Sequence, residues 1–427
     1  MRELGTVVST RPRHEVGNVD VVTATAHEPA RVTPGIGRTP WIMLAMATSG
    51  FALNFWAWAL LSPLGPMFAE DLGLSAFQQS LIVAVPVLVG SVGRIPVGAL
   101  TDRFGGRVMF PVVSVATLVP VLYVGIAGHS SLAALLVGGF FLGIGGTAFA
   151  IGVPVVNKWF PPEKRGLAIG IFGAGMGGTA ISALTTVPLV NAGGVPVPFI
   201  LTAIALAAFA VVAALWFRDA PAAAGASESL LRRMAVVVRL PITWYASMLY
   251  ALAFGGYVAF SVYLPTYLRT GYELARIDAA NRMAGFVLLA VVARPLGGWL
   301  SDRFGPERVL SASLLVVAGG AVAQSFAPEL MPLGTIAFLS MATALGAATG
   351  ATFALIALLT PAHRVGAVTG FVGAAGGLGG FVPPLLMGAN YEMIGTYAVS
   401  LLLLAGATTA AAITVRMIKR DWISSAA

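Results

Sequence analysis

Long apolar blocks follow one another from Trp41 onward and are separated by short polar segments. Each block approaches the roughly 20 mostly apolar residues that a helix needs to cross a bilayer. Stretches such as 203–217 are apolar on every side, whereas the strands of a membrane barrel alternate apolar and polar positions. The pattern therefore predicts twelve membrane-spanning helices. The predicted spans are 41–66, 76–100, 109–128, 131–157, 166–190 and 195–217, followed by 242–268, 280–300, 308–326, 331–359, 366–389 and 393–417.

Polar segments divide these spans into two sets of six. A linker at 218–240 separates a first half, 41–217, from a second half, 241–417. Residues 1–40 are polar and contain no apolar run long enough for a signal-peptide core, so we expect a disordered cytoplasmic tail. Residues 418–427 form a second, shorter cytoplasmic tail in this prediction.

The composition agrees with an all-α membrane protein. Of 427 residues, 58% are hydrophobic and 10% are charged, against about 25% charged in soluble domains. The chain has no cysteine, which excludes disulfides, zinc–thiolate sites and cysteine nucleophiles, and its four histidines do not cluster in an apolar span. These absences argue against a metal site. We also expect neither an enzymatic activity nor a cofactor.

The positive charge lies on one predicted face of the membrane. Twenty of the 25 Lys and Arg residues fall in the tails, the linker and the loops that follow even-numbered spans, and only Arg269, Arg276 and Arg282 fall in an opposite loop. An excess of Lys and Arg marks the cytoplasmic side, so both termini are expected there. This distribution explains the net charge of +8 without a nucleic-acid partner.

The two halves repeat at a constant offset of 200 positions. A segment that ends the second span recurs at the end of the eighth, as Gly98, Asp102 and Arg103 and again as Gly298, Asp302 and Arg303. Six spans per half in the same orientation give a parallel 6+6 pseudo-twofold repeat, as in the two halves of major facilitator transporters.

The repeated segment resembles the loop two to three signature of the major facilitator superfamily. Its glycines allow neighbouring helices to approach, and its Asp and Arg can form cytoplasmic charge pairs that hold one conformation closed. The alternative to this gating role is that the segment forms only a tight turn, with its arginine on the cytoplasmic side according to the positive-inside rule.

Glycines recur at every third or fourth position of the fifth and eleventh spans. The repeated positions are Gly170, Gly173 and Gly177, matched by Gly370, Gly373 and Gly377. Such stripes permit close packing and sliding of helices, and ordinary packing is the alternative. No strand precedes them, so they are not a nucleotide-binding loop.

Two arginines, Arg94 and Arg294, lie inside predicted spans at equivalent positions of the repeat. Each precedes an interfacial Asp by eight residues, or roughly 12 Å, which approaches the middle of a core about 30 Å thick. Placing an unpaired cation at that depth costs at least about 2.5 kcal/mol of free energy. Each arginine therefore needs an internal acidic partner, a side chain that extends to the cytoplasmic surface, or a ligand. All 17 acidic residues are placed in tails, loops or interfacial turns, which favours an anionic ligand. The guanidinium fork suits planar oxyanions.

Together with the glycine stripes and the runs 54–66 and 254–261, these arginines make the chain resemble the nitrate/nitrite porter family of the major facilitator superfamily. The resemblance implies that Arg94 and Arg294 clamp the anion and that aromatic rings sandwich it. By motif position those rings are Phe149, Tyr250 and Phe254, for which core packing is the alternative. Several members carry an Asn in the fifth-span stripe where this chain has Met176.

The resulting hypothesis is a monomeric secondary transporter of nitrate and/or nitrite in the lipid bilayer of the cytoplasmic (inner) membrane. Nitrate/nitrite exchange is favoured because no acidic residue or histidine is placed in a span interior to carry a coupled proton. The alternatives are nitrate/proton symport, transport of another small planar anion such as formate or oxalate, and a receptor or scaffold that transports nothing.

Overall fold

The computed structural model describes residues 38–221, 236–360 and 364–417, and these residues contain helices but no strand. The predicted tails, apart from residues 38–40, and most of the predicted linker lie outside the described residues. Twelve helical segments of the described chain are long and apolar enough to cross a membrane. The predicted number of spans is confirmed, and the first span extends to Leu72 rather than residue 66.

The first half contains spans built from more than one helical piece. Its elements are α1 (Arg38–Trp58), α2 (Leu61–Leu72), α3 (Ala76–Val92), α4 (Arg94–Phe104), α5 (Gly106–Ile126), α6 (Leu132–Leu142), η1 (Gly143–Thr147), α7 (Ala148–Trp159), α8 (Pro162–Gly173), η2 (Ala174–Gly177), α9 (Gly178–Gly193) and α10 (Pro196–Trp216). Glycine has low helix propensity, and the tighter 3₁₀ turns η1 and η2 coincide with the glycine-rich runs at 143–146 and 173–178.

The second half is more continuous. Its elements are α12 (Pro241–Tyr272), α13 (Arg276–Phe304), α14 (Pro306–Ser325), η3 (Leu330–Gly334), α15 (Thr335–Leu359), α16 (Val365–Gly379), α17 (Val382–Ile394) and α18 (Ala398–Met417). The seventh and eighth spans are single helices, whereas the first and second are each divided in two.

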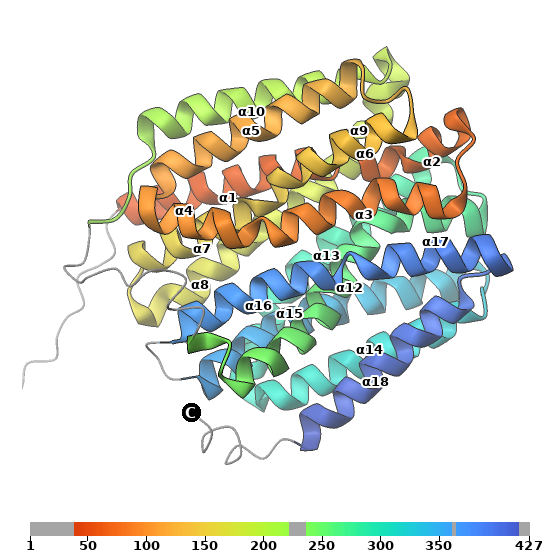
Figure 1. Ribbon diagram of the computed structural model, residues 1–427. Coiled ribbons are helices and arrows are strands. Elements are labelled where there is room, and N and C mark those ends of the chain that lie inside the picture. The colour runs from red at the N-terminus through yellow and green to blue at the C-terminus, as the bar shows by residue number, and fades with distance from the viewer. Residues whose placement is uncertain (1–37, 222–235, 361–363, 418–427) are drawn as a thin grey trace, which may run out of the picture. The chain divides into compact units, whose positions relative to one another are not determined.

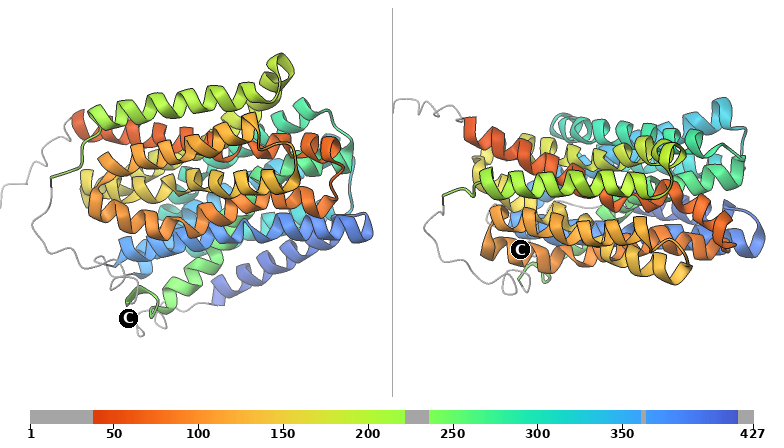
Figure 2. Two further views of the ribbon diagram at one scale, coloured as in Figure 1. Left: turned by 45° about the horizontal axis from the view of Figure 1, so that its top comes forward. Right: turned by 90° about the horizontal axis from the view of Figure 1, so that it is seen from above.

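The packing of the helices follows the repeat. At one edge of the bundle α5 lies against α10, and at the opposite edge α14 lies against α18 (Figure 1). Each pair consists of the third and sixth spans of its half. Between the halves α3 packs on α17 and α9 packs on α13, so that the second and fifth spans of one half meet the fifth and second of the other. Figure 2 shows the same helices from two further directions.

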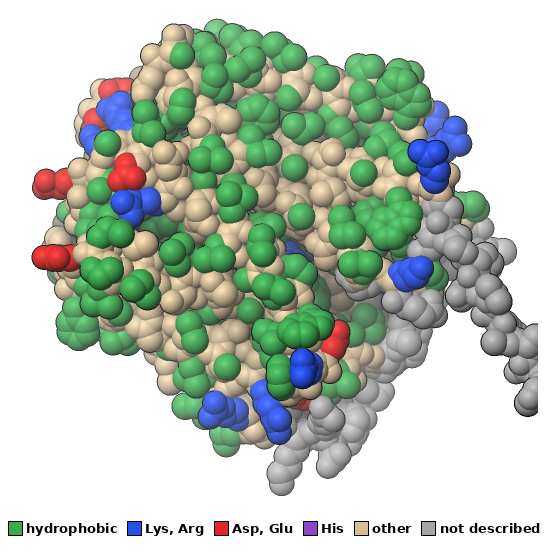
Figure 3. All heavy atoms as spheres, turned by 180° about the vertical axis from the view of Figure 1, so that it is seen from behind, with side chains coloured by type: hydrophobic (Ala, Val, Ile, Leu, Met, Phe, Trp, Pro, Cys, Tyr) green, Lys and Arg blue, Asp and Glu red, His purple; other side chains and the backbone are tan. Residues whose placement is uncertain are grey.

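The outer surface is suited to lipid. Large apolar side chains such as Val119, Ile126 and Leu215 are 63%, 65% and 64% exposed. Figure 3 shows a face dominated by hydrophobic side chains, with Lys, Arg, Asp and Glu gathered toward its margins. Monomeric soluble proteins rarely expose so much apolar surface, and together with the twelve long apolar helices this surface makes the chain a multi-pass membrane protein.

Candidate functional site

Arg94 begins helix α4, directly after the break in the second span at Gly93. An added Cβ at Gly93 would come within 2.8 Å of both the Thr147 side chain and a backbone carbonyl, so only glycine permits this close approach. The arginine is 7% exposed. Its Nη1 donates to the Gly373 carbonyl of the other half at 2.7 Å, and its Nε donates to the Gly146 carbonyl at 3.4 Å.

Arg294 lies within the uninterrupted helix α13 and is 5% exposed. Its Nη1 contacts the Met176 sulfur at 2.7 Å, and its Nη2 donates to the Tyr250 hydroxyl at 3.5 Å, the limit for a hydrogen bond. The guanidinium carbon lies 5.4 Å from the centre of the Phe353 ring. Like Arg94, this arginine reaches across to the fifth span of the opposite half, through Met176.

Aromatic rings surround both guanidinium groups. The Arg94 guanidinium carbon lies 5.2 Å from the Phe149 ring centre and 5.5 Å from that of Phe254. Tyr250 and Phe254 are stacked with centroids 5.0 Å apart and planes 4° apart. The structure thus brings together all five residues predicted to bind the anion, whose roles remain predictions.

Neither arginine has an acidic partner among the described residues. The ion pairs given there join Glu70 to Arg269 and Arg276, and Asp278 to Arg282. The polar contacts of Arg94 and Arg294 are backbone carbonyls, a thioether and a phenol. No group of His, Asp or Glu in the described part of the chain could hold a metal ion. Two buried cations with neutral partners make a site suited to a small anion.

Comparisons with known proteins assign the chain to a family. A model of the Major Facilitator Superfamily matches residues 47–284 and 278–422. The chain is 47% identical over 386 residues to the "Probable nitrate/nitrite transporter NarK2" of Mycobacterium tuberculosis, which covers 90% of this chain and 98% of the relative. It is 36% identical to the "Nitrite extrusion protein" of Bacillus subtilis, over 88% of this chain and 93% of the relative. The chain belongs to the nitrate/nitrite porter family of the major facilitator superfamily.

A solved structure supports the fold of this porter. A bacterial homolog of the human lysosomal transporter Spinster superimposes with a TM-score of 0.69 at 17% sequence identity, over 92% of this chain and 97% of that one. The predicted fold class, a twelve-helix major facilitator bundle, is confirmed. Proteins of this family are transporters, so the porter is not an enzyme.

The glycines of the porter's stripes have different surroundings. An added Cβ at Gly173 would lie 3.5 Å from the Arg294 guanidinium, and one at Gly373 would lie 3.3 Å from the Phe149 ring. A Cβ at Gly377 would meet the Ser91 hydroxyl and lie 3.2 Å from Arg94 Nη1. Open space surrounds the remaining stripe positions that were predicted to act in gating, Gly170, Gly177 and Gly370. Three of the six glycines therefore border the site itself.

The other predicted gating residues lie at the linker-side ends of α4 and α13. Asp102 and Arg103 come just before Gly105, and Asp302 and Arg303 come just before Gly305; both glycines turn the chain with positive φ, at 80° and 89°. The Arg103 guanidinium lies over the Phe104 ring at 5.0 Å, and that of Arg303 over the Phe304 ring at 5.5 Å. Gly98 would place a Cβ 3.9 Å from Ala150, and Gly298 faces open space. Their gating role remains a prediction.

Sequence reasoning missed Phe353. It lies one helical turn beyond Thr349, the residue that the offset of 200 pairs with Phe149. The signal that could have found it is an aromatic residue in the tenth span, the counterpart of the fourth span that carries Phe149.

Proposed function

We propose that this porter carries nitrate and/or nitrite across the cytoplasmic membrane by alternating access, with one anion held between Arg94 and Arg294. The observation that carries the proposal is the pair of buried guanidinium groups, one from each half, without a carboxylate partner among the described residues. The relatives named as nitrate or nitrite transporters support the choice of anion.

The chemistry of the site fits a flat oxyanion. A guanidinium presents a planar fork of N–H donors, and two such forks can donate to different oxygens of one planar anion. The rings of Phe149 and Phe254 flank Arg94 and supply flat apolar walls. An anion between the arginines adds a charge–charge attraction that their uncharged partners do not supply.

Binding at the interface of the halves links the anion to the change of access. Two like charges in a region of low dielectric repel each other, and a monovalent anion between them reduces the net charge from +2 to +1. The empty site therefore opposes approach of the halves, and the loaded site permits it. This difference in interaction energy between states is what a ligand needs to shift a conformational equilibrium.

We assign exchange of nitrate for nitrite as the transport mode, with nitrate/proton symport as the alternative. No Asp, Glu or His contacts either arginine among the described residues, so the site has no evident proton carrier. In proteoliposomes, nitrate uptake should require internal nitrite or nitrate and should change little with an imposed pH gradient.

Two outcomes would redirect this proposal. Accumulation of nitrate into vesicles without internal anion, driven by a pH gradient, would replace exchange by symport. Stronger competition by formate or oxalate than by nitrite would change the substrate, and complete absence of anion flux would favour a receptor.

The positive-inside rule places both termini and the linker in the cytoplasm, with the loop from Arg269 to Arg282 outside. The chain lacks cysteine, so a single Cys in the linker and another in that loop can be labelled separately in sealed vesicles. Labelling of the linker from outside would overturn this orientation. Both arginines belong to one chain, so a monomer contains the complete site.

A further inference from the structure

Phe353 on helix α15 connects two members of the site. Its ring centre lies 5.4 Å from the Arg294 guanidinium carbon, and its ring meets the Tyr250 ring edge-on, with centroids 4.8 Å apart and an interplanar angle of 61°. Phe353 is half-buried, whereas Tyr250 is fully buried. The ring therefore lies beside the guanidinium at a margin of the site.

The repeat gives this contact a counterpart. Phe149 lies beside Arg94 from the fourth span, and Phe353 lies beside Arg294 from the tenth span. The position equivalent to Phe149 is Thr349, whose hydroxyl bonds its own helix at the Leu345 carbonyl. The aromatic contact is thus retained one turn further along α15, about 6 Å nearer the C-terminal end of that helix.

Arg294 has fewer strong hydrogen-bond acceptors beside it than Arg94 has. Apart from the Phe353 ring, its contacts are a thioether, which is a weak acceptor, and a phenol at 3.5 Å. Arg94 by contrast has a backbone carbonyl at 2.7 Å and two rings. We propose that Phe353 is a positioning residue, whose ring orients the Arg294 guanidinium toward the anion; this rests on the proposed function.

The test compares variants that keep or remove the ring. We expect Phe353→Leu to raise the half-saturating nitrate concentration about 5- to 20-fold, because a desolvated cation–π contact is lost. Maximal flux should stay within about twofold, since the remaining site is intact. Phe353→Tyr and Phe353→Trp keep a ring, and at least one should restore the affinity.

Phe371→Leu is the matched control, because Phe371 packs on the exposed Trp244 at 5.6 Å and contacts neither arginine. It should leave the half-saturating concentration unchanged. The inference fails if Phe353→Leu behaves like this control, or if neither ring variant restores affinity. Absence of flux in the unmodified porter would instead refute the proposed function, so the two failures are distinguishable.

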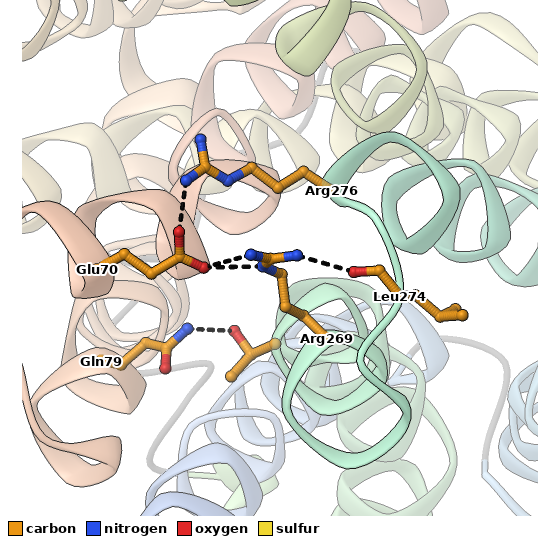
Figure 4. Close-up of polar contacts among 6 residues, drawn as sticks. Glu70, Gln79, Arg269, Leu274 and Arg276 are labelled. Carbon is orange, nitrogen blue, oxygen red and sulfur yellow. Dashed lines mark hydrogen bonds and ion pairs between the residues drawn. The ribbon is translucent and has the colours of Figure 1, made fainter.

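A cluster of charged side chains joins the two halves at the end of the bundle opposite the linker (Figure 4). Glu70, at the end of α2, accepts hydrogen bonds from Arg269 Nε and Nη2 at 2.9 and 2.6 Å and from Arg276 Nη2 at 2.5 Å. Arg269 also donates to the Leu274 carbonyl at 3.0 Å. One carboxylate of the first half is thus held by two guanidinium groups of the second. We call Glu70, Arg269 and Arg276 the outer clasp.

Further hydrogen bonds join the halves near the outer clasp. Gln79 donates to the Thr266 hydroxyl at 3.1 Å (Figure 4). The Ser62 hydroxyl donates to the Val262 carbonyl at 2.6 Å. Both contacts are buried. The halves therefore meet closely at this end, and access to Arg94 and Arg294 from there requires these contacts to separate.

We propose that the outer clasp is a latch that favours closure of this end of the porter. Its side chains are 31–44% exposed, and an exposed ion pair contributes little on its own. The clasp is stronger than one such pair because two arginines share the carboxylate and one binds it through two nitrogens. Loss of the clasp should increase the fraction of molecules that are open at this end by a moderate factor, without unfolding the porter.

The experiment uses Ser62→Cys as a reporter, since Ser62 is 2% exposed at the contact between the halves. A membrane-impermeant thiol reagent is applied from the side opposite the linker. Adding Glu70→Gln or Arg276→Gln should increase the labelling rate about three- to tenfold, since a charge network is broken.

Asp278→Asn is the matched control, because it breaks an ion pair with Arg282 at the same end but within a single helix. It should change the rate by less than about twofold. Equal rates for Glu70→Gln and Asp278→Asn would refute the latch. The measurement needs no nitrate, so it is independent of the proposed substrate.

Discussion

Arg94 and Arg294 occupy equivalent positions of the repeat, yet their surroundings differ. Arg94 is fixed by a backbone carbonyl of the opposite half at 2.7 Å, whereas Arg294 meets the sulfur of Met176 at the same distance. A carbonyl is a strong acceptor held by the backbone, and a thioether is a weak one on a flexible side chain. The repeat has thus kept the two cations without keeping their partners.

The two arginines also differ in their positions along their helices: Arg94 is the first residue of α4, and Arg294 lies inside α13. Arg94 begins α4 directly after Gly93, whose lack of a side chain lets the second span approach Thr147. Arg294 lies in an uninterrupted helix. The Arg94 side is organised by main-chain contacts, whereas the described contacts of Arg294 come from side chains alone.

The largest effect is expected when each of the two arginines is replaced by lysine. Arg94→Lys and Arg294→Lys retain the charge but lose the planar fork, so each should lower nitrate transport by more than roughly tenfold. Uptake is measured in proteoliposomes at matched protein content, with Arg282→Lys as the control. Near-normal uptake by both variants would refute the clamp.

Equivalent glycines provide the next test. Gly377→Ala would place a Cβ against Ser91 and 3.2 Å from Arg94 Nη1, whereas Gly177→Ala enters open space. Overpacking typically costs about 1–3 kcal/mol, so we expect Gly377→Ala to reduce transport about 5- to 100-fold. Gly177→Ala should stay within about threefold. Equal losses in both variants would show that the contacts with Ser91 and Arg94, which only an added Cβ at position 377 makes, do not set the effect.

The sequence predicts the spans because the thickness of the bilayer sets the length of each apolar block. The offset of 200 also predicts the equivalence of the arginines, since it depends only on residue identity. Tertiary packing decides the rest. Nothing local shows that Met176 contacts Arg294, or that the ring beside that arginine comes from Phe353 rather than from position 349.

Ion pairs between residues far apart in the chain are equally difficult to predict from the sequence. Glu70 lies 199 and 206 positions before its two partners, Arg269 and Arg276. From the sequence these charges are only residues near span ends, which topology alone explains. The contact becomes visible when the second half is placed against the first.

Met176 is the residue that can make the two sides more alike. Met176→Asn introduces an amide at Arg294 that can donate to an anion, so the half-saturating nitrate concentration should fall about three- to tenfold. Met176→Leu removes the sulfur and keeps an apolar side chain, and it is the matched control. If the two variants give the same affinity, polarity at this position does not explain the difference between the arginines.

The smallest effect is expected from the Tyr250 hydroxyl. Tyr250→Phe removes the hydroxyl that accepts from Arg294 Nη2 at 3.5 Å but keeps the ring that stacks on Phe254. So long a hydrogen bond contributes little, and the half-saturating concentration should rise only about two- to threefold. Tyr272→Phe, which removes a hydroxyl bonded to Gln324 away from the site, is the control.

Combining Tyr250→Phe with Met176→Asn shows through which arginine the hydroxyl acts. Both residues contact Arg294, so their effects on affinity should be non-additive, as for residues that share a partner. With Gly373→Ala, which packs against Phe149 beside Arg94, the effects should add. The opposite result would be additive effects of Tyr250→Phe and Met176→Asn together with non-additive effects of Tyr250→Phe and Gly373→Ala. It would show that the Tyr250 hydroxyl acts through Arg94 rather than through Arg294.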